Sequence, residues 1–284
     1  MKFLMSVLAM ALCASYFASV SCPDDWKELK GEHFVVYFTQ NQEFAKQVLS
    51  KAETYYKNIA TGLGYPRYSE FWIWEKRVKI YIHPDHNSFL KASHQPEWSE
   101  GMADYTNKQI TSFAWSQGFV ESLLPHEIAH LIFRDFVGFK GEVRLWLDEG
   151  VAQWAEENRR QASRKMIKKA YDDDMLLTFD DMMNLNIMKI TEKGGTYIRP
   201  TVTRSGDRVT MILGGENLVS LYYLEAVSMV DFLIEKYGSK DFAGFCRELR
   251  DGKRLESALR FVYSNRIDTI EEFESRWRKY VSQL

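Results

Sequence analysis

The strongest constraint on this chain is a pair of histidines four residues apart, His126 and His130, with Glu127 directly after the first. Residues at i and i+4 of a helix lie on one face about one turn apart, so both imidazoles can reach the same ion. Flanking apolar residues at helical intervals predict a half-buried helix rather than a loop. Pro125 is compatible with this helix in its first turn, where no backbone N–H is needed.

A third ligand is offered by the stretch Trp-Leu-x-Glu-Gly, whose glutamate, Glu149, lies 19 positions after His130. Zinc accepts two imidazole nitrogens and a carboxylate oxygen, and a catalytic site leaves its fourth position to water. A turn containing Gly138 and Gly141 predicts that a second helix returns beside the histidines. Two alternatives stay open: Asp148 is a competing oxygen ligand, or Glu149 is an exposed acid at a helix start for which Asp148 is the N-cap.

His-Glu-x-x-His, eighteen intervening residues and Glu within Trp-Leu-x-Glu-Gly together resemble the gluzincin metallopeptidases. The resemblance implies that His126, His130 and Glu149 bind Zn²⁺. It also implies that Glu127 is the catalytic general base acting on the metal-bound water. Aminopeptidases of this kind carry a Gly-x-Met-Glu-Asn segment before the zinc helix, and this chain has none there, so aminopeptidase specificity does not carry over.

The segment 223–238 resembles the helix that follows the zinc site in small "peptidase MA-like" gluzincins. By that resemblance Tyr223 donates a hydrogen bond to the oxyanion, with Tyr222 as the alternative donor. Packing within an apolar stripe is the competing interpretation of both tyrosines. Gln153 and Glu156 follow the third ligand by one and two helical turns, and we predict that they orient a zinc-bound ligand; surface solvation is the alternative for both.

The predicted element order favours an α+β, zincin-like fold. It has an N-terminal mixed α/β lobe, with a small sheet and the active-site helix, and a C-terminal mainly helical lobe. Strands are expected at 33–38, 78–82 and 107–114, and helices at 44–63, 151–169, 218–237, 241–250, 254–263 and 270–281. By analogy with zincins, the strand containing Ile110 is the sheet edge along which an extended substrate lies antiparallel. The segment 190–213 predicts a hairpin or loop.

The N-terminus predicts export from the cytoplasm. Lys2 precedes an apolar stretch, 3–20, and small residues follow, which is typical of a signal peptide spanning 1–22. The mature protein is then secreted, or periplasmic and retained in the cell envelope. An uncleaved signal anchor and lipidation of Cys22 are the alternatives, and each gives a membrane tether. A mature chain keeps only Cys22 and Cys246, too few for a disulfide scaffold or a cysteine zinc site.

Residues 23–284 suffice for a single catalytic domain with lobes at roughly 23–136 and 137–284. The net charge of −2 gives no basic surface for nucleic acid. His83, Asp85 and His86 lie close together after a strand; we interpret them as structural, with a second metal site as the alternative.

The sequence as a whole predicts a secreted zinc-dependent metallopeptidase acting on peptide or protein substrates. One alternative is a zincin-fold envelope binding or assembly protein without catalysis, and Glu127 argues against it because a structural metal site needs no general base. Another alternative is a zinc hydrolase of a non-peptide bond, which would use the same residues. No local motif identifies the substrate.

Overall fold

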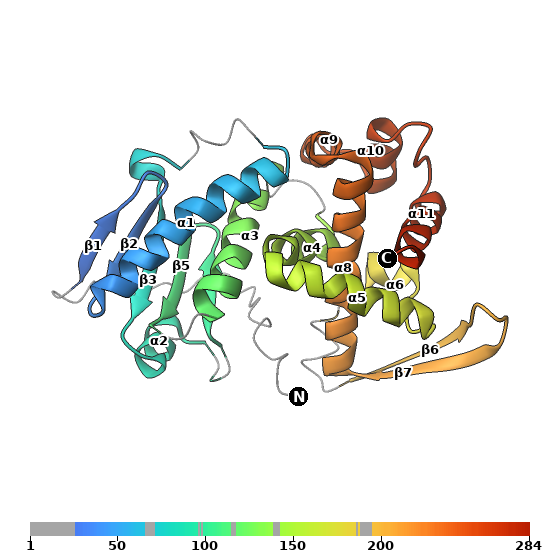
Figure 1. Cartoon of the computed structure of the whole chain (residues 1–284), viewed down its shortest axis with the longest axis horizontal. Helices are drawn as coiled ribbons and strands as arrows, with labels where there is room; N and C mark the ends of the chain where they lie inside the picture. The colour runs from blue at the N-terminus through green and yellow to red at the C-terminus, as the bar shows by residue number, and fades with distance from the viewer. Residues whose placement is uncertain are drawn as a thin grey trace. The chain divides into compact units, whose positions relative to one another are not determined.

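The computed structural model of the protein describes residues 26–65, 72–95, 97, 99–114, 118–138, 143–185, 187 and 195–284. The predicted signal peptide with Cys22, and Gly141 of the predicted turn, lie outside these residues. The fold is mixed α+β, with a small mixed sheet and a mainly helical remainder (Figure 1). Two compact units make up the chain, Met1–Arg134 and Asp135–Leu284.

The first unit contains a five-stranded sheet in the order β1-β2-β3-β5-β4. Its strands are β1 (Lys27–Lys30), β2 (Phe34–Phe38), β3 (Val78–His83), β4 (Gly101–Asp104) and β5 (Gln109–Phe113). The three central strands, β2, β3 and β5, are parallel, and β1 and β4 are antiparallel strands at the two edges. The sequence predicted the central strands, whose side chains are largely apolar, and missed the two short edge strands.

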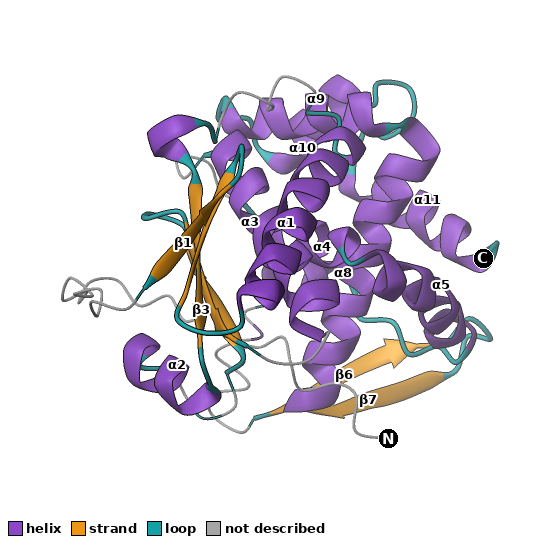
Figure 2. Ribbon diagram, turned by 60° about the vertical axis from the view of Figure 1, so that its left-hand side comes forward, coloured by secondary structure: helices purple, strands orange, loops and turns teal. Residues whose placement is uncertain are grey.

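Helix α1 (Gln42–Gly62) covers one face of this sheet and packs against β2 (Figure 2). It begins at Asn41, whose side chain accepts a hydrogen bond from the Phe44 N–H and so satisfies one free backbone donor. Its buried stripe repeats at helical intervals and includes Ala45, Val48, Ala52, Tyr56 and Ile59. Helix α2 (His86–Ser93) follows β3 and packs against β5.

The strand containing Ile110 is not the edge of the sheet, which corrects the sequence-based prediction. Ile110 pairs with Ile80 of β3 on one side and with Ala103 of β4 on the other. The edge is therefore β4, whose sequence Gly-Met-Ala-Asp lacks the alternation of apolar residues that predicts a strand.

The second unit is mainly helical, and its described residues include an antiparallel hairpin. Its elements are α4 (Leu145–Ala155), α5 (Glu157–Asp172), α6 (Phe179–Asn184), β6 (Thr196–Val202), β7 (Arg208–Gly214), α8 (Gly215–Tyr237), α9 (Ser239–Arg250), α10 (Leu255–Val262) and α11 (Ile270–Ser282). The single helix predicted at 151–169 is wrong, because the chain breaks at Glu156, whose ψ of 82° is not helical.

Helix α8 is the core of this unit. By length and apolar composition it could cross a membrane, but 78% of its most apolar stretch is buried inside the protein. It packs against α4, α5, α9 and α11. Asp231 on α8 accepts two hydrogen bonds from Arg164 of α5, at 2.8 and 3.0 Å, and one from the Tyr280 hydroxyl of α11. A polar network therefore joins α8 to its neighbouring helices.

Candidate metal centre

The two histidines lie on a helix that is preceded by a π-turn. The turn, η3 (Phe119–Leu123), runs directly into α3 (Leu124–Val137), and the Leu124 N–H donates to the Phe119 carbonyl oxygen. Pro125 follows as the second residue of α3, directly after the π-turn, at a position where the continuous helix lacks one backbone donor. The predicted helix is confirmed, but every residue from Leu124 to Phe133 is buried, so the helix is not half-buried as predicted. Polar side chains of the motif are buried along with the apolar ones.

His126 and His130 face each other through their Nε2 atoms, which are 3.2 Å apart. The rings are 4.8 Å apart between centroids and nearly perpendicular, and the ring of Tyr105 meets that of His130 edge-on at 6.0 Å. The two histidines are only 5% and 1% exposed. Two neutral imidazoles placed this way need a proton or a cation between their nitrogen atoms, because two lone pairs at this distance repel each other.

Glu149 is buried well inside α4, as is Asp148 beside it. Trp146 to Trp154 are all buried, and Glu149 is 2% exposed. The helix begins at Leu145 with Arg144 as its N-cap, so Asp148 is not the cap and Glu149 is not an exposed acid at the helix start. That alternative is therefore wrong. A buried carboxylate requires compensation by hydrogen bonds, by positive charge or by a metal ion.

The glycine of Trp-Leu-x-Glu-Gly has a packing role. A Cβ atom on Gly150 would lie 2.6 Å from the carbonyl oxygen of Ala226 and 2.8 Å from a methyl carbon of Val230, both on α8. Only glycine therefore permits α4 to approach α8 this closely. The glutamate and glycine of the motif serve different purposes, because Glu149 supplies a carboxylate and Gly150 fixes the position of its helix against α8.

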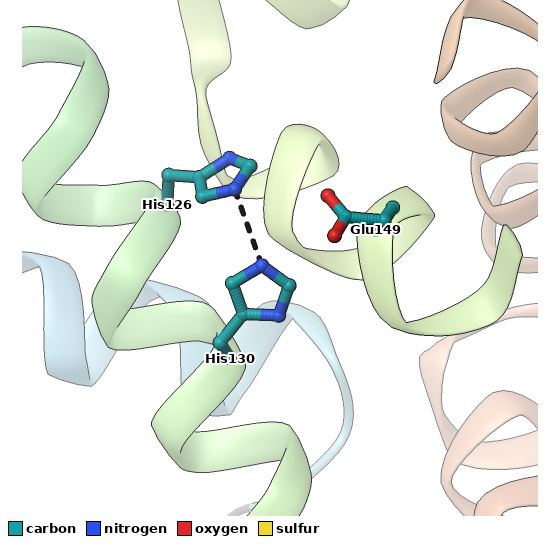
Figure 3. Close-up of side chains that lie close together, drawn as sticks. All are labelled: His126, His130 and Glu149. Carbon is teal, nitrogen blue, oxygen red and sulfur yellow. Dashed lines mark hydrogen bonds between the residues drawn. The ribbon is translucent and has the colours of Figure 1, made fainter. Parts of the chain in front are cut away.

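His126, His130 and Glu149 form a group that could hold a metal ion. One ligand atom from each lies within 4.8 Å of the others, and all three residues are buried. Figure 3 shows the two imidazoles on α3 and the carboxylate on α4. Asp148 is not part of this group. Two imidazole nitrogens and one carboxylate fit zinc with an open fourth position, although the same ligands also bind other divalent transition metals.

No protein-family model matches this chain, and no curated protein matches it significantly. What the gluzincin resemblance implies for Glu127 and Tyr223 stays a prediction. Glu127 lies between the two histidines on α3 and is 9% exposed.

Of the two candidate tyrosines on α8, Tyr222 already has a structural partner. Its hydroxyl donates to the Met182 carbonyl oxygen of α6 at 3.2 Å, and the residue is 1% exposed. Burial and the negative charge of Glu149 raise the pKa of Tyr223 well above its ordinary value. The Tyr223 phenol is therefore protonated at neutral pH and able to donate a hydrogen bond. Burial and Glu149 raise the pKa of Tyr222 as well, so only the hydrogen bond of Tyr222 to Met182 distinguishes the two tyrosines, and the oxyanion role of Tyr223 stays a prediction.

Glu156 and Gln153 are both buried, at 2% and 3% exposure, so surface solvation does not describe either residue. Glu156 occupies the break between α4 and α5, and both its carboxylate oxygens accept from an Arg159 nitrogen at 3.4 Å. The Gln153 side-chain nitrogen is buried without a hydrogen-bond partner among the described residues. A buried amide donor of this kind costs stability unless a ligand or water accepts its hydrogen bond.

His83, Asp85 and His86 do not form a second metal group in the described part of the chain. Asp85 caps α2, and its carboxylate accepts from the Ser88 N–H at 2.8 Å. His86 Nε2 lies 2.8 Å from the Ser99 carbonyl oxygen. Their structural interpretation agrees with these contacts.

Sequence reasoning also missed Glu225 of α8, an acid that is fully buried. One of its oxygens accepts from the Leu177 N–H at 2.7 Å, and the other has no hydrogen-bond partner among the described residues. Burial raises the pKa of Glu225 to about 8. The signal for it in the sequence is a charged residue at a position of the apolar stripe of α8.

Proposed function

We propose that this protein is a secreted zinc-dependent metallopeptidase of the gluzincin type with a zincin-like fold. The observation that carries the proposal is the buried group of His126, His130 and Glu149, with ligand atoms within 4.8 Å of one another. Glu127 adds a second argument, because a purely structural metal site has no use for a buried general base beside its ligands.

Bound zinc would supply Lewis-acid chemistry, lowering the pKa of a water molecule and polarising the scissile carbonyl. Glu127 accepts the proton of the attacking water and later delivers it to the leaving amine, so that the carboxylate is regenerated in each cycle. Tyr223 donates a hydrogen bond to the oxygen on which negative charge develops. Glu156 and Gln153 hold the ligand residues in position rather than contact the substrate.

The edge strand β4 supports a binding mode for an extended substrate. β4 ends at Asp104, and the next residue, Tyr105, places its ring 6.0 Å from that of His130. The edge strand therefore ends close to the histidine pair. A peptide that adds to β4 as a further strand forms backbone hydrogen bonds with it, and these bonds do not depend on the peptide's sequence.

Two measurements on purified protein test the proposal. Metal analysis should find about one zinc per chain in the wild type and in Glu127→Gln. A digest of a broad peptide library should show cleavage by the wild type and none by Glu127→Gln. Glu121→Gln is the matched control, because Glu121 is an exposed acid on the π-turn just before the motif. Its cleavage activity should equal that of the wild type.

Each other outcome contradicts the proposal in a recognisable way. Full peptide turnover by Glu127→Gln removes Glu127 from the mechanism. Bound zinc without cleavage of any peptide favours a binding or assembly protein. Cleavage of ester or amide probes, with no peptide cleaved, favours a hydrolase of another bond. Detection of the protein only in the cytoplasm of its source cells contradicts secretion.

A further inference from the structure

The β6–β7 hairpin of the second unit has one buried face and one exposed face. Side chains alternate between the two faces along each strand. On the inward face, Tyr197, Met211 and Leu213 are buried. On the outward face, Ile198 and Ile212 are cross-strand partners and are 62% and 64% exposed. Sheets of two strands are marginally stable in water, so an apolar pair exposed on one of them indicates an interaction surface.

The outer edge of β7 is the edge of this hairpin that can accept another strand. Figures 1 and 2 both show β6 between β7 and α5, so β7 is the outer strand. β6 is tied to α6, because the Tyr197 hydroxyl donates to Asp181 at 2.6 Å. Pro200 also removes a backbone donor from β6, whereas β7 contains no proline. Among the described residues β7 pairs with β6 alone, which leaves its other edge open.

The hydrogen-bond pattern of the hairpin determines which backbone groups of β7 point toward this open edge. The Thr203 N–H donates to the Asp207 carbonyl oxygen at 2.9 Å, and hydrogen-bonded pairs alternate with non-hydrogen-bonded pairs from there. Along the register, Ile212 falls at a non-hydrogen-bonded pair. Its N–H and C=O therefore point away from β6, as do those of Thr210 and Gly214.

Two opposite charges lie at the two ends of β7. Arg208 is the first residue of the strand, and Glu216 lies in the first turn of α8, directly after it. Both are exposed, and neither forms an ion pair in the described part of the chain. Each lies four positions from Ile212 in the sequence. A second, antiparallel β7 centred on Ile212 therefore places each Arg208 opposite the Glu216 of the other copy, so the strand is complementary to itself.

A shifted register would lose this match. Centring the pairing on Met211 instead sets Arg208 opposite Gly214, and the charges gain no partner. Centring it on Ile212 also aligns the exposed isoleucines in one row across four strands, because Ile198 and Ile212 of each copy continue into those of the other. Neighbouring β-branched side chains on adjacent strands stabilise a sheet.

We propose that the partner of this hairpin is a second copy of the chain. The two β7 strands pair antiparallel about a two-fold axis at Ile212 and form a four-stranded sheet, and each Arg208 forms an ion pair with the Glu216 of the other copy. Unrelated peptides and lipid surfaces supply no opposite charges at this fixed spacing. Dimerisation is separate from the proposed hydrolysis, because none of these residues is a ligand of the candidate metal centre.

Sedimentation velocity of the purified protein over a range of concentrations tests the dimer. The wild type should shift from monomer to dimer as its concentration rises. Arg208→Glu and Glu216→Arg each set like charges opposite each other at both ends of the strand pair, so each variant alone should dimerise about tenfold more weakly. An equimolar mixture of the two variants should recover the wild-type affinity, because the mixed dimer has opposite charges at both ends.

Two isoleucine variants distinguish pairing at the β7 edge from contact through the exposed face. Ile212→Lys places two ammonium groups at the two-fold axis and should abolish the dimer. Ile198→Lys is the matched control, because Ile198 is almost equally exposed but lies on β6, away from the new strand pair. It should dimerise nearly as well as the wild type. All the replaced side chains are exposed, so the melting temperatures of the monomers should stay close to that of the wild type.

A protein that stays monomeric at every concentration overturns the proposal, and so does a dimer that neither charge variant weakens. Failure of the mixed variants to associate as tightly as the wild type contradicts the pairing of Arg208 with Glu216 and the register built on it. Equal losses with Ile198→Lys and Ile212→Lys assign the interface to the exposed face and contradict strand pairing. A monomer that binds vesicles of phosphatidylcholine and phosphatidylglycerol, and loses that binding with Ile212→Lys, assigns the hairpin to a lipid surface and also overturns the proposal.

Discussion

Gly150 and Ala226 are in such close contact that a Cβ atom on Gly150 would lie 2.6 Å from the Ala226 carbonyl oxygen. The obstacle is backbone, which cannot move aside as a flexible side chain would. We therefore expect Gly150→Ala to destabilise the protein by about 1–3 kcal/mol and to displace α4, which carries Glu149. Urea unfolding and zinc titration measure the two effects.

The matched control for that substitution is Gly214→Ala. Gly214 has an ordinary φ of −68°, and a Cβ atom there meets nothing within 4 Å. Its stability should stay within about 0.5 kcal/mol of the wild type. Equal effects of the two substitutions would show that Gly150 has no special packing role.

Removal of the metal should lower thermal stability, because a ligand that binds only the folded state stabilises it. At a free zinc concentration 100 times the dissociation constant, the gain is about 2.7 kcal/mol. We expect Glu149→Gln to lose most of the rise in melting temperature that zinc gives to EDTA-stripped protein. Asp148→Asn should keep that rise, since Asp148 is outside the group. The reverse result would make Asp148 the ligand.

Substitutions of the two tyrosines of α8 should have separable effects. Tyr222→Phe removes the hydrogen bond to the Met182 carbonyl oxygen and should cost about 1 kcal/mol of stability, with kcat nearly unchanged. Tyr223→Phe should lower kcat by about 10²-fold with little change in KM, as expected for a donor that acts mainly in the transition state. Peptide kinetics and urea unfolding of both variants decide the assignment. A loss of kcat confined to Tyr222→Phe would instead assign the oxyanion donor to Tyr222 and a structural role to Tyr223.

Glu225 should make stability depend on pH. Its pKa in the folded state is about 8, above the ordinary value of 4.5, so the folded state binds more protons between these values. The associated stability is present below pH 4.5 and is lost as the pH rises through about 8. Glu225→Gln keeps an acceptor for the Leu177 N–H and carries no charge. Urea unfolding in EDTA should be measured at pH 5.5 and 8.5. The free energy of unfolding of the variant, relative to that of the wild type, should be higher at pH 8.5 than at pH 5.5. An identical pH profile for the two proteins would contradict the shift.

The sequence predicted the metal-ligand group because its signal is a spacing between side chains. The interval between His130 and Glu149 suffices for a helix, a reversal and a returning helix, whatever the details of the turn. The burial of Glu149 was harder to foresee, because an acidic residue near a helix start is usually exposed. The structure explains the burial, because α4, the helix that carries Glu149, packs closely against α8 at Gly150.

The missed strand, the missed helix break and the missed buried acids each have a different physical cause. β4 was missed, and β5 was taken for the edge, because a four-residue edge strand needs no apolar alternation. The break at Glu156 was missed because no glycine or proline marks it, so local propensity favours one continuous helix. Glu225 and Asp231 interrupt the apolar stripe of α8 with buried acids, whose partners lie on elements distant in sequence.

The π-turn before α3 amounts to one extra residue inserted into a continuous helix. An ordinary helical turn rotates by about 100° per residue, so deleting one residue between Phe119 and Leu123 would restore α-helical geometry but turn Phe119 by roughly that angle relative to His126. The buried Phe119 ring and the histidine pair could not both keep their present orientations. The orientation of the histidines relative to the core of the first unit therefore depends on the number of residues in this turn. A one-residue deletion there should reduce stability more than most substitutions do.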